Sequence, residues 1–337
     1  MYYEYAPNRG DKTMNKKISI GIVGYGNLGK GAEKAVLQNL DMELIAIFSR
    51  RALKDTQNGV PVVNIAKIAE YQGKVDVMLL CGGSATDLGK QGPEIAGMFN
   101  TVDSFDTHEK ITEYYQSVDE AARRSGNLAA VSVGWDPGLF SLYRGLGSLV
   151  LPQGTTYTFW KGVSLGHSNA ICQIEGVKYA IQYTIPRKES IHAVRDGGTP
   201  ALHAGDAHWR DCYVVADEGA DLARIEQQIK TMPNYFAEYE TKVHFISEED
   251  FHAKHMEMPH GGLVFCSYEP SPGEKNIIEF SLKLDKNPEF TAFVLTACAR
   301  AVFRMAMKGE VGAITILDIP LGHLSAEEPA ELRKRLL

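Results

Sequence analysis

The segment Gly24-Tyr25-Gly26-Asn27-Leu28-Gly29 constrains the fold of this chain more than any other. It satisfies G-x-G-x-x-G, directly follows the apolar run Ile18 to Gly24, and opens a helical pattern over Asn27 to Asn39. A second apolar run, Glu43 to Phe48, completes β-α-β spacing. In this setting the three glycines permit a tight turn, close approach of a pyrophosphate and close helix packing. We predict a dinucleotide site at the helix N-terminus; the alternative is an incidental glycine-rich turn.

Further apolar runs indicate a parallel sheet that is covered on both faces. They span Val75 to Leu80, Asn100 to Val102 and Leu128 to Val133, and each lies beside a helical segment. Continuous apolar strands that alternate with helices are typical of doubly wound α/β folds. We therefore predict an N-terminal Rossmann domain with a doubly wound parallel sheet over residues 18–133.

The pattern changes after the turn signal Trp135-Asp136-Pro137-Gly138, which precedes a helical pattern toward Val150. Because 337 residues exceed what one core usually supports, a second domain is expected. Shorter helical segments and alternating strands predict an α+β domain with a mostly antiparallel sheet over 134–287. A long helical pattern from Pro288 to Lys308 suggests that residues 288–337 complete the first domain, and we expect residues 1–17 to form a flexible tail. The strand candidates are 155–160, 177–185, 211–215, 241–245, 262–268 and 277–284.

Composition and charge argue against several classes of function. Apolar residues make up 44% and charged residues 23% of the chain, as in ordinary soluble proteins. A net charge of −7 with scattered cations argues against nucleic acid as a partner. The five cysteines are far apart and lack a C-x-x-C pair, which argues against disulfides. The first seventeen residues lack the apolar region of a signal peptide, and no run reaches the ~18 apolar residues of a membrane span. We expect a cytoplasmic protein with a small-molecule substrate and no membrane partner.

The end of the second apolar run indicates which dinucleotide binds. NAD-binding proteins usually carry an acidic residue here for the ribose 2′-hydroxyl, whereas this chain has Phe48-Ser49-Arg50-Arg51. A hydroxyl and two guanidinium groups suit a 2′-phosphate, so NADP(H) is the predicted cofactor. The alternative is a pair of solvated loop arginines.

The segment Cys81-Gly82-Gly83-Ser84 follows the strand candidate 75–80 and should line the same crevice. Cys81 is a poor candidate nucleophile, because cysteines in apolar strands usually pack and no histidine is its sequence neighbour.

Three acidic residues follow strand candidates. Asp103 and Asp106 come after 100–102, and Asp136 comes after 128–133. Because the carboxyl ends of parallel strands meet at one edge, we predict that all three face the crevice there. Helix capping or turn formation is the alternative for Asp106 and Asp136.

His252, His255 and His260 are candidate metal ligands, since H-x-x-H with a third histidine can bind zinc. The surrounding signature is absent, and the spacing equally suits an exposed helix end. No metal is predicted.

Five motifs together resemble the meso-diaminopimelate dehydrogenase family: Val23 to Gly29, Phe48 to Arg51, Gly134 to Gly138, Met258 to Gly262 and Leu284 to Phe290. The resemblance implies a homodimer that catalyses NADP-dependent, reversible oxidative deamination. The implied substrate is meso-2,6-diaminopimelate, oxidised at its D-centre to L-2-amino-6-oxopimelate (tetrahydrodipicolinate) with release of ammonia. The implied pathway is lysine biosynthesis, and the second domain would bind substrate and form the dimer.

The resemblance also implies roles for particular residues. Asp106 and Asp136 would contact the reacting amino centre as catalytic residues, and the distal amino-acid end would be held by Thr184, Arg210, His260 and Asn287. Carboxylates for ammonium groups and polar donors for carboxylates agree with this assignment. Arg210 as a surface residue, Asn287 as a helix N-cap and Trp160 as core are the alternatives. Trp160, Ser164, Leu165 and Gly166 would wall the substrate pocket. The predicted cofactor site also includes Ser104, Phe105, Asp106, Val133, Gly134, Trp135, Asp136 and Pro137.

Hydride leaves an amine-bearing carbon only after the ammonium has lost a proton, and the proton acceptor stays unassigned. His167 is either a proton relay or a structural histidine. Three other functions stay open at this point: a broader D-amino-acid dehydrogenase, another Rossmann oxidoreductase, and a non-catalytic NADPH sensor.

Overall fold

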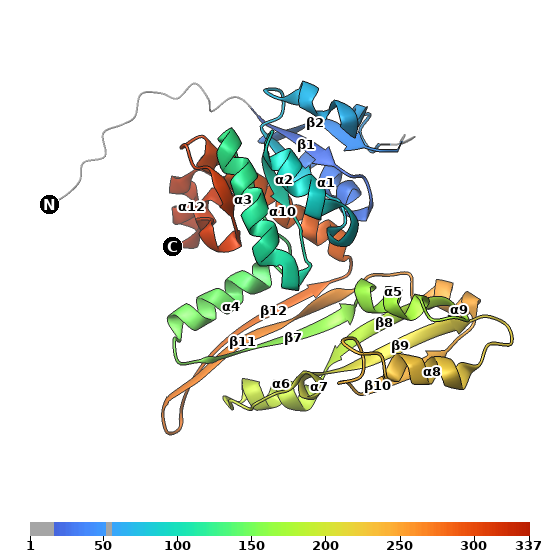
Figure 1. The fold of residues 1–337 in the computed structure, drawn as a ribbon. Helices are drawn as coiled ribbons and strands as arrows, with labels where there is room; N and C mark the ends of the chain where they lie inside the picture. The colour runs from blue at the N-terminus through green and yellow to red at the C-terminus, as the bar shows by residue number, and fades with distance from the viewer. Residues whose placement is uncertain (1–16, 52–55) are drawn as a thin grey trace. The chain divides into compact units, whose positions relative to one another are not determined.

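The structure, a computed structural model, describes residues 17–51 and 56–337. Residues 1–16 of the predicted tail therefore lie outside the described residues. The chain divides into two compact units (Figure 1). Unit 1 contains the chain through Leu139 together with Pro288–Leu337, and unit 2 contains Phe140–Asn287.

Unit 1 is built on a parallel sheet with the strand order β13-β6-β5-β4-β1-β2-β3. The order reverses direction between β1 and β4, and ligands of doubly wound sheets bind outside the carboxyl ends of strands at such a point. The Rossmann prediction is confirmed. The strands are β1 (Ile18–Val23), β2 (Met42–Ser49), β3 (Val62–Asn64), β4 (Val77–Leu80), β5 (Asn100–Asp103), β6 (Leu128–Ala130) and β13 (Gly312–Ile314).

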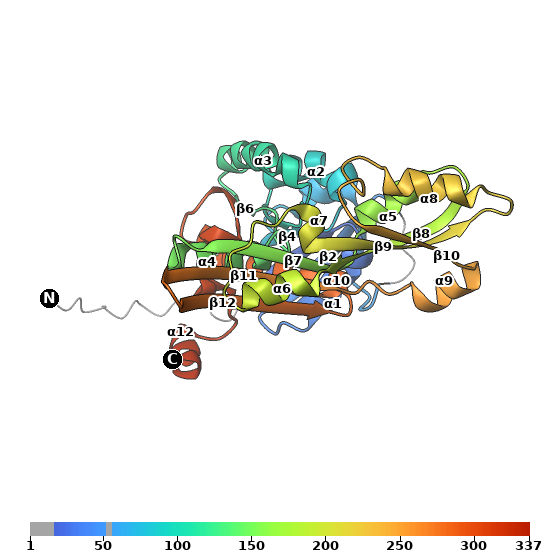
Figure 2. The ribbon, with the colours of Figure 1, turned by 90° about the horizontal axis from the view of Figure 1, so that it is seen from below.

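Helices cover both faces of this sheet. Every residue of β1 and β4 is buried, as expected for strands packed on two sides. Figure 2 shows α2 and α3 on one side of the sheet and α1 and α10 on the other. The helices are α1 (Asn27–Leu37), α2 (Gly89–Ala96), α3 (Ile111–Ser125) and α10 (Asn287–Ala306), with the short elements η2 (Ile65–Tyr71), η3 (Ser84–Leu88), η4 (His108–Lys110), η5 (Ile316–Asp318), α11 (Leu321–Leu324) and α12 (Pro329–Leu336).

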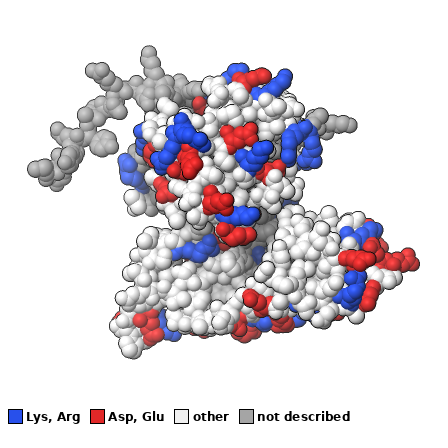
Figure 3. All heavy atoms as spheres, viewed as in Figure 1, with Lys and Arg blue, Asp and Glu red and all other residues white. Residues whose placement is uncertain are grey.

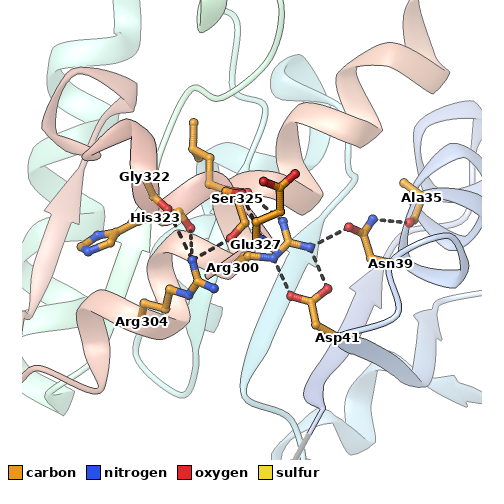
Figure 4. A network of polar contacts seen from close by, with 10 residues as sticks. Ala35, Asn39, Asp41, Arg300, Arg304, Gly322, His323, Ser325 and Glu327 are labelled. Atoms are coloured by element: carbon orange, nitrogen blue, oxygen red, sulfur yellow. Dashed lines mark hydrogen bonds and ion pairs between the residues drawn. The ribbon is translucent and has the colours of Figure 1, made fainter. Parts of the chain in front are cut away.

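Two arginines of α10 tie the C-terminal segment to the rest of unit 1 (Figure 4). Arg300 is only 3% exposed, and its Nε and Nη2 lie 2.6 and 2.8 Å from the two carboxylate oxygens of Asp41. Its Nη1 donates to the carbonyl of Leu324 at 2.8 Å. Arg304 donates to the carbonyls of His323 and Ser325. The buried guanidinium of Arg300 thus joins the segment before β2 to the last residue of α11.

Unit 2 is built on a sheet with the order β10-β9-β8-β7-β11-β12. Only the β9–β10 pair is parallel among the described pairs, so the prediction of a mostly antiparallel sheet is confirmed. The strands are β7 (Thr155–Val163), β8 (Val177–Pro186), β9 (His208–Ala216), β10 (Thr241–Phe245), β11 (His260–Ser271) and β12 (Glu274–Leu284). The helices are α4 (Leu139–Val150), α5 (Leu165–Cys172), α6 (Lys188–Arg195), α7 (Ala204–Ala207), α8 (Leu222–Lys230) and α9 (Glu248–Lys254).

The two faces of β8 and β9 pack against different helices. Cys212 and Val214 form a cluster with Ile171 of α5 and Ile225 of α8, whereas Val215 packs with Phe251 of α9. Figure 2 shows α5 and α8 on one side of these strands and α9 on the other. Alternate strand residues share a face, so Arg210 lies on the α5 side with Cys212.

None of the helices among the described residues is long and apolar enough to cross a membrane. On the face drawn in Figure 3, acidic and basic side chains are interspersed.

Candidate functional site

The glycine-rich turn of unit 1 has the geometry that a pyrophosphate requires. Gly24 adopts a φ of +89°, and its N–H donates to the carbonyl of Phe48 at 2.9 Å. A side chain at Gly29 would collide with the Gly24 carbonyl, whereas nothing lies within 4 Å of where a Cβ on Gly26 would be. The backbone at Gly26 therefore faces open space at the N-terminus of α1. These residues fit the diphosphate of a dinucleotide.

One pocket of unit 1 gathers many of the predicted cofactor residues. It joins the carboxyl ends of β1, β2 and β4, which are brought together by parallel pairing. Asn27, Leu28, Gly29 and Ser84 are not among its lining residues. Its lining includes the predicted residues Gly24, Tyr25, Gly26, Ser49, Arg50, Arg51, Cys81, Gly82 and Gly83, and the unpredicted residues Phe48, Ile65, Asp87 and Gln91.

Tyr25, the variable residue of the turn, is held by a carboxylate that the sequence analysis missed. Its hydroxyl donates to Oε2 of Glu33, whose side chain is fully buried in α1. Burial and then the Glu33 carboxylate raise the pKa of Tyr25 to about 12. Oε1 of Glu33 has no hydrogen-bond partner among the described residues. Glu33 lies among polar and small residues in the sequence, so only its position two helical turns beyond Tyr25 could have signalled the contact.

The end of β2 forms one edge of the pocket. The hydroxyl oxygen of Ser49 accepts a hydrogen bond from the N–H of Arg51 at 3.1 Å. The guanidinium of Arg50 pairs with Asp87 of η3, which follows β4. Arg50 and Arg51 both line the pocket, and two neighbouring cations are suited to a phosphate group.

Cys81 packs rather than reacts. Its side chain is buried, and that burial raises the pKa of the thiol to about 12. A thiol held neutral is a weak nucleophile.

The three candidate acids of unit 1 differ in environment. Asp106 is exposed, and its N–H donates to the hydroxyl of Ser84 at 3.0 Å, so the loops after β4 and β5 meet. Asp136 is half-buried and precedes a cis peptide bond to Pro137. The prediction that Asp103 faces the crevice is wrong, because it is fully buried.

Asp103 instead anchors the carboxyl end of β5. It accepts hydrogen bonds from the backbone of Phe105 and Ser132, both at 3.0 Å, and from the Tyr114 hydroxyl at 2.7 Å. Burial raises the pKa of this carboxyl. The ring of Phe105 stacks on Tyr114 at 4.0 Å inside the core, so its side chain faces away from solvent. Val133 and Gly134 are buried, whereas Ser104, Trp135 and Pro137 are half-buried.

In unit 2, Arg210 and Thr184 lie side by side on β9 and β8. They are paired in the strand register, and Nη1 of Arg210 donates to the Thr184 hydroxyl at 2.5 Å. The guanidinium lies 3.9 Å from the centre of the Tyr239 ring, and its Nε has no partner among the described residues. Arg210 is only 7% exposed, and burial lowers the pKa of the guanidinium.

No carboxylate of the described residues forms an ion pair with this buried cation. An unpaired buried charge is costly, so the arrangement suits an anionic ligand. The alternative of Arg210 as a surface strand residue is wrong, since the side chain is buried. Tyr239 was not predicted, because its contact with Arg210 depends on a chain reversal that the sequence does not show.

Two histidines near Arg210 are held neutral. Nε2 of His208 accepts a hydrogen bond from the backbone N–H of Trp160 at 2.8 Å, and the two rings stack with their centres 5.5 Å apart. His167 Nδ1 lies 2.7 Å from the Ser164 hydroxyl. Burial, followed by the charge of Arg210, lowers the pKa of each histidine to about 4. The two imidazoles thus add no positive charge beside Arg210 at neutral pH.

His208 is a second residue that the sequence analysis missed. It lies two residues before Arg210 and therefore on the same face of β9. That spacing was the available signal.

The other predicted substrate residues are spread over unit 2. Trp160 is 41% exposed, so core packing does not describe it. It lines a pocket with His208 and Tyr239. Leu165 and Gly166 are exposed at the start of α5, and Ser164 is half-buried beside them. Among the described residues this pocket brings together Trp160, His208 and Tyr239, but not Ser164, Leu165, Gly166, Thr184, Arg210, His260 or Asn287.

His260 and Asn287 occupy element ends. His260 opens β11, opposite Gly162, and its Nδ1 lies 2.9 Å from the Met258 carbonyl. Burial lowers the pKa of this imidazole. Asn287 is the first residue of α10 and thus lies one position past the N-cap, so its contact with the substrate stays a prediction.

The three candidate metal-binding histidines contact different residues. His255 Nδ1 lies 3.0 Å from the Tyr183 hydroxyl, and His252 lies near Glu248. Over residues 17–51 and 56–337, no group of three or more His, Cys, Asp or Glu side chains is arranged to hold a metal.

Comparison with known proteins agrees with the sites described in unit 1 and in unit 2. Residues 134–286 match the family described as the diaminopimelic acid dehydrogenase C-terminal domain. The chain is 56% identical to the meso-diaminopimelate D-dehydrogenase of Ureibacillus thermosphaericus, over 95% of this chain and 99% of that protein. This chain belongs to the meso-diaminopimelate dehydrogenase family.

Solved structures of the family have the same fold. A mutant of the meso-diaminopimelate dehydrogenase from Clostridium tetani E88, solved with DAP, is 52% identical with a TM-score of 0.90, over 95% of this chain and all (100%) of that one. An engineered D-amino acid dehydrogenase bound to NADP⁺ is 43% identical with a TM-score of 0.84, over 96% and 100% of the two chains. The first of these proteins is bound to DAP and the second to NADP⁺.

Proposed function

We propose that this protein oxidises the D-centre of meso-2,6-diaminopimelate with NADP⁺, reversibly, to L-2-amino-6-oxopimelate and ammonia. The observation that carries the substrate class is Arg210, a buried guanidinium without a protein carboxylate partner among the described residues. A substrate carboxylate would supply the missing charge and accept from the open Nε. Thr184, already bound to the same guanidinium, would fix its orientation.

NADP⁺ fits the residues of the unit 1 pocket. Gly24 to Gly26 would hold the diphosphate, and Ser49, Arg50 and Arg51 would hold the 2′-phosphate. When bound, this cofactor supplies an acceptor for the hydride that leaves the substrate carbon.

Asp106 and Asp136 are proposed to contact the amino group of the D-centre. Their carboxylates would bind the ammonium and orient it, and a proton must leave the nitrogen before the carbon–hydrogen bond breaks with its electron pair. The nitrogen lone pair then forms a carbon–nitrogen double bond. Water adds to that carbon, and ammonia leaves to give the oxo product.

The residues around Arg210 would select the distal amino-acid end. Trp160, held by the neutral His208, would present its indole to the substrate as a wall. Ser164, Leu165, Gly166, His260 and Asn287 are proposed as further contacts by family membership. Because both histidines nearest Arg210 are neutral, the carboxylate would meet one cation rather than three.

A homodimer in a reducing cytoplasm is part of the proposal. All five cysteines are free, which suits a compartment that keeps thiols reduced. The dimer is inferred from family membership.

The test measures NADP⁺ reduction at alkaline pH with meso-diaminopimelate, its LL isomer and D-alanine, and repeats each assay with NAD⁺. We expect turnover only with the meso isomer, and only when NADP⁺ is the cofactor. Equal turnover of D-alanine would mean that the protein is a broader D-amino-acid dehydrogenase. Binding of NADPH without turnover of any amino acid would favour a sensor.

A further inference from the structure

One ion pair joins two edges of the proposed cofactor site. Nη2 of Arg50, just after β2, lies 2.6 Å from Oδ1 of Asp87, in η3 after β4. Both residues line the pocket that contains Gly24 to Gly26. A pair between loops 37 residues apart therefore lies where the 2′-phosphate of NADP is proposed to bind.

Asp87 is the fixed member of this pair. Its Oδ2 accepts hydrogen bonds from the N–H of Gly83 at 3.2 Å and from the Thr86 hydroxyl at 3.0 Å. The Asp87 side chain is 15% exposed and that of Arg50 is 69% exposed. The turn therefore anchors Asp87 through Oδ2 and leaves Oδ1 for Arg50, whereas an exposed arginine without such a partner samples many rotamers.

The glycine turn makes this anchor possible. A Cβ on Gly82 would lie 2.8 Å from the Cβ of Asp87, so a larger residue at 82 would displace it. Gly82 thus allows Asp87 to pack against the turn.

The contact leaves most of the guanidinium available. It uses one nitrogen of Arg50, and a guanidinium carries five N–H donors in a planar fork. The remaining donors can bind a phosphate with less loss of rotamer freedom, because the fork is already oriented.

We propose that Asp87 is a specificity-determining positioning residue, which holds Arg50 in place for the 2′-phosphate of NADP and acts only through that arginine. This inference rests on the proposed NADP function. It predicts that Asp87 governs the preference for NADP over NAD.

The experiment measures dissociation constants of the full-length protein by calorimetry with 2′,5′-ADP, 5′-ADP, NADP⁺ and NAD⁺. Asp87→Asn keeps the shape and removes the charge. We expect it to weaken 2′,5′-ADP and NADP⁺ about fivefold, as loss of an ion pair of this kind would, and to leave 5′-ADP and NAD⁺ unchanged. In an Arg50→Ala background the same change should have no further effect. Thr86→Val, which loosens the anchor, should cause a smaller loss in the same direction.

Glu94→Gln is the matched control, because Glu94 is an exposed carboxylate of α2 outside the pocket lining. Equal weakening of 5′-ADP and 2′,5′-ADP would reduce Asp87 to a structural role and overturn the inference. Tighter 2′,5′-ADP binding would overturn it too, since the carboxylate would then compete with the phosphate. A wild-type protein that does not prefer 2′,5′-ADP over 5′-ADP would overturn the NADP proposal itself.

Discussion

The hydroxyl of Tyr25 donates a hydrogen bond to the carboxylate of Glu33, two helical turns further along α1. Glu33 is fully buried, and its second oxygen has no partner among the described residues. The tyrosine of the dinucleotide-binding turn is thus fixed from inside the domain. An unmade hydrogen bond at a buried polar group costs more than a made one contributes, so this contact holds the shape of the turn.

Tyr25→Phe should destabilise unit 1, because it leaves the buried Glu33 carboxylate without this donor. The expected loss is about 1–3 kcal/mol in the free energy of unfolding, measured by urea denaturation. Tyr71→Phe is the control, since Tyr71 contacts Phe48 and Lys74 through its ring and its hydroxyl makes no hydrogen bond to a described residue. Equal stability of the two variants would show that the Tyr25–Glu33 contact contributes nothing.

Arg210→Leu should weaken substrate binding without affecting the cofactor. We expect KM for meso-diaminopimelate to rise about 100-fold, because the distal carboxylate loses a buried charged partner. The affinity for NADPH, which is proposed to bind in unit 1, should stay the same. Arg195→Leu on α6 provides a control, as Arg195 pairs with Glu279 on the surface. If KM stayed at the wild-type value, or if NADPH affinity fell as well, Arg210 would not read the distal carboxylate.

The stability of unit 2 should fall on mild acidification. The pKa values of His167 and His208 are lowered from 6.5 to about 4 in the fold. Between these values the unfolded chain binds more protons than the native one, so their contribution is complete above pH 6.5 and is lost as pH falls toward 4. In His208→Gln the amide oxygen can still accept the hydrogen bond from Trp160, but the side chain does not titrate. The free energy of unfolding of this variant should therefore fall less steeply between pH 6.5 and 4 than that of the wild type. Denaturation at several pH values in this range measures the slope, and an unchanged slope would contradict the prediction.

Asp41 should make the stability of unit 1 depend on pH in a lower range than the two histidines do for unit 2. Burial opposes its ionisation, but the hydrogen bonds and charge of Arg300 lower the pKa of the carboxyl below its ordinary 3.8. The contribution is therefore present above pH 3.8 and is lost as pH falls through the folded-state value. Asp41→Asn should cost about 3 kcal/mol at neutral pH, because Arg300 stays buried without its anion. The difference from the wild type should shrink in acid, as measured by denaturation at each pH.

The sequence predicted the fold well where strands lie in continuous apolar or alternating runs. It identified β1, β2, β4, β5 and β6 and all strands of unit 2, because period and burial leave a direct pattern there. It missed β3 and β13, the two edge strands of the parallel sheet, because each has three residues of which some are exposed or only half-buried, whereas the three residues of β6 are all buried within a longer apolar run.

The sequence predicted individual site residues less evenly. Strand ends and the glycine turn placed Ser49 and Gly24 in one pocket, because parallel strands align their carboxyl ends. Asp87, His208 and Glu33 were missed, since each acts through a partner that only the fold brings near. Asp103 was misplaced because position at a strand end does not say which way the side chain points.

Asp103 and Asp136 offer a matched contrast for catalysis. Asp136→Asn should lower kcat by about 100-fold or more while NADPH affinity stays nearly constant, because the proposed contact is with the reacting amino group. Asp103→Asn should instead lower the melting temperature, since its carboxylate accepts from Phe105, Ser132 and Tyr114 inside the core. Steady-state kinetics, NADPH titration and thermal unfolding of both variants distinguish the two roles. An Asp136→Asn enzyme that keeps wild-type turnover would remove that carboxylate from the reaction and leave Asp106 as the candidate partner of the amine.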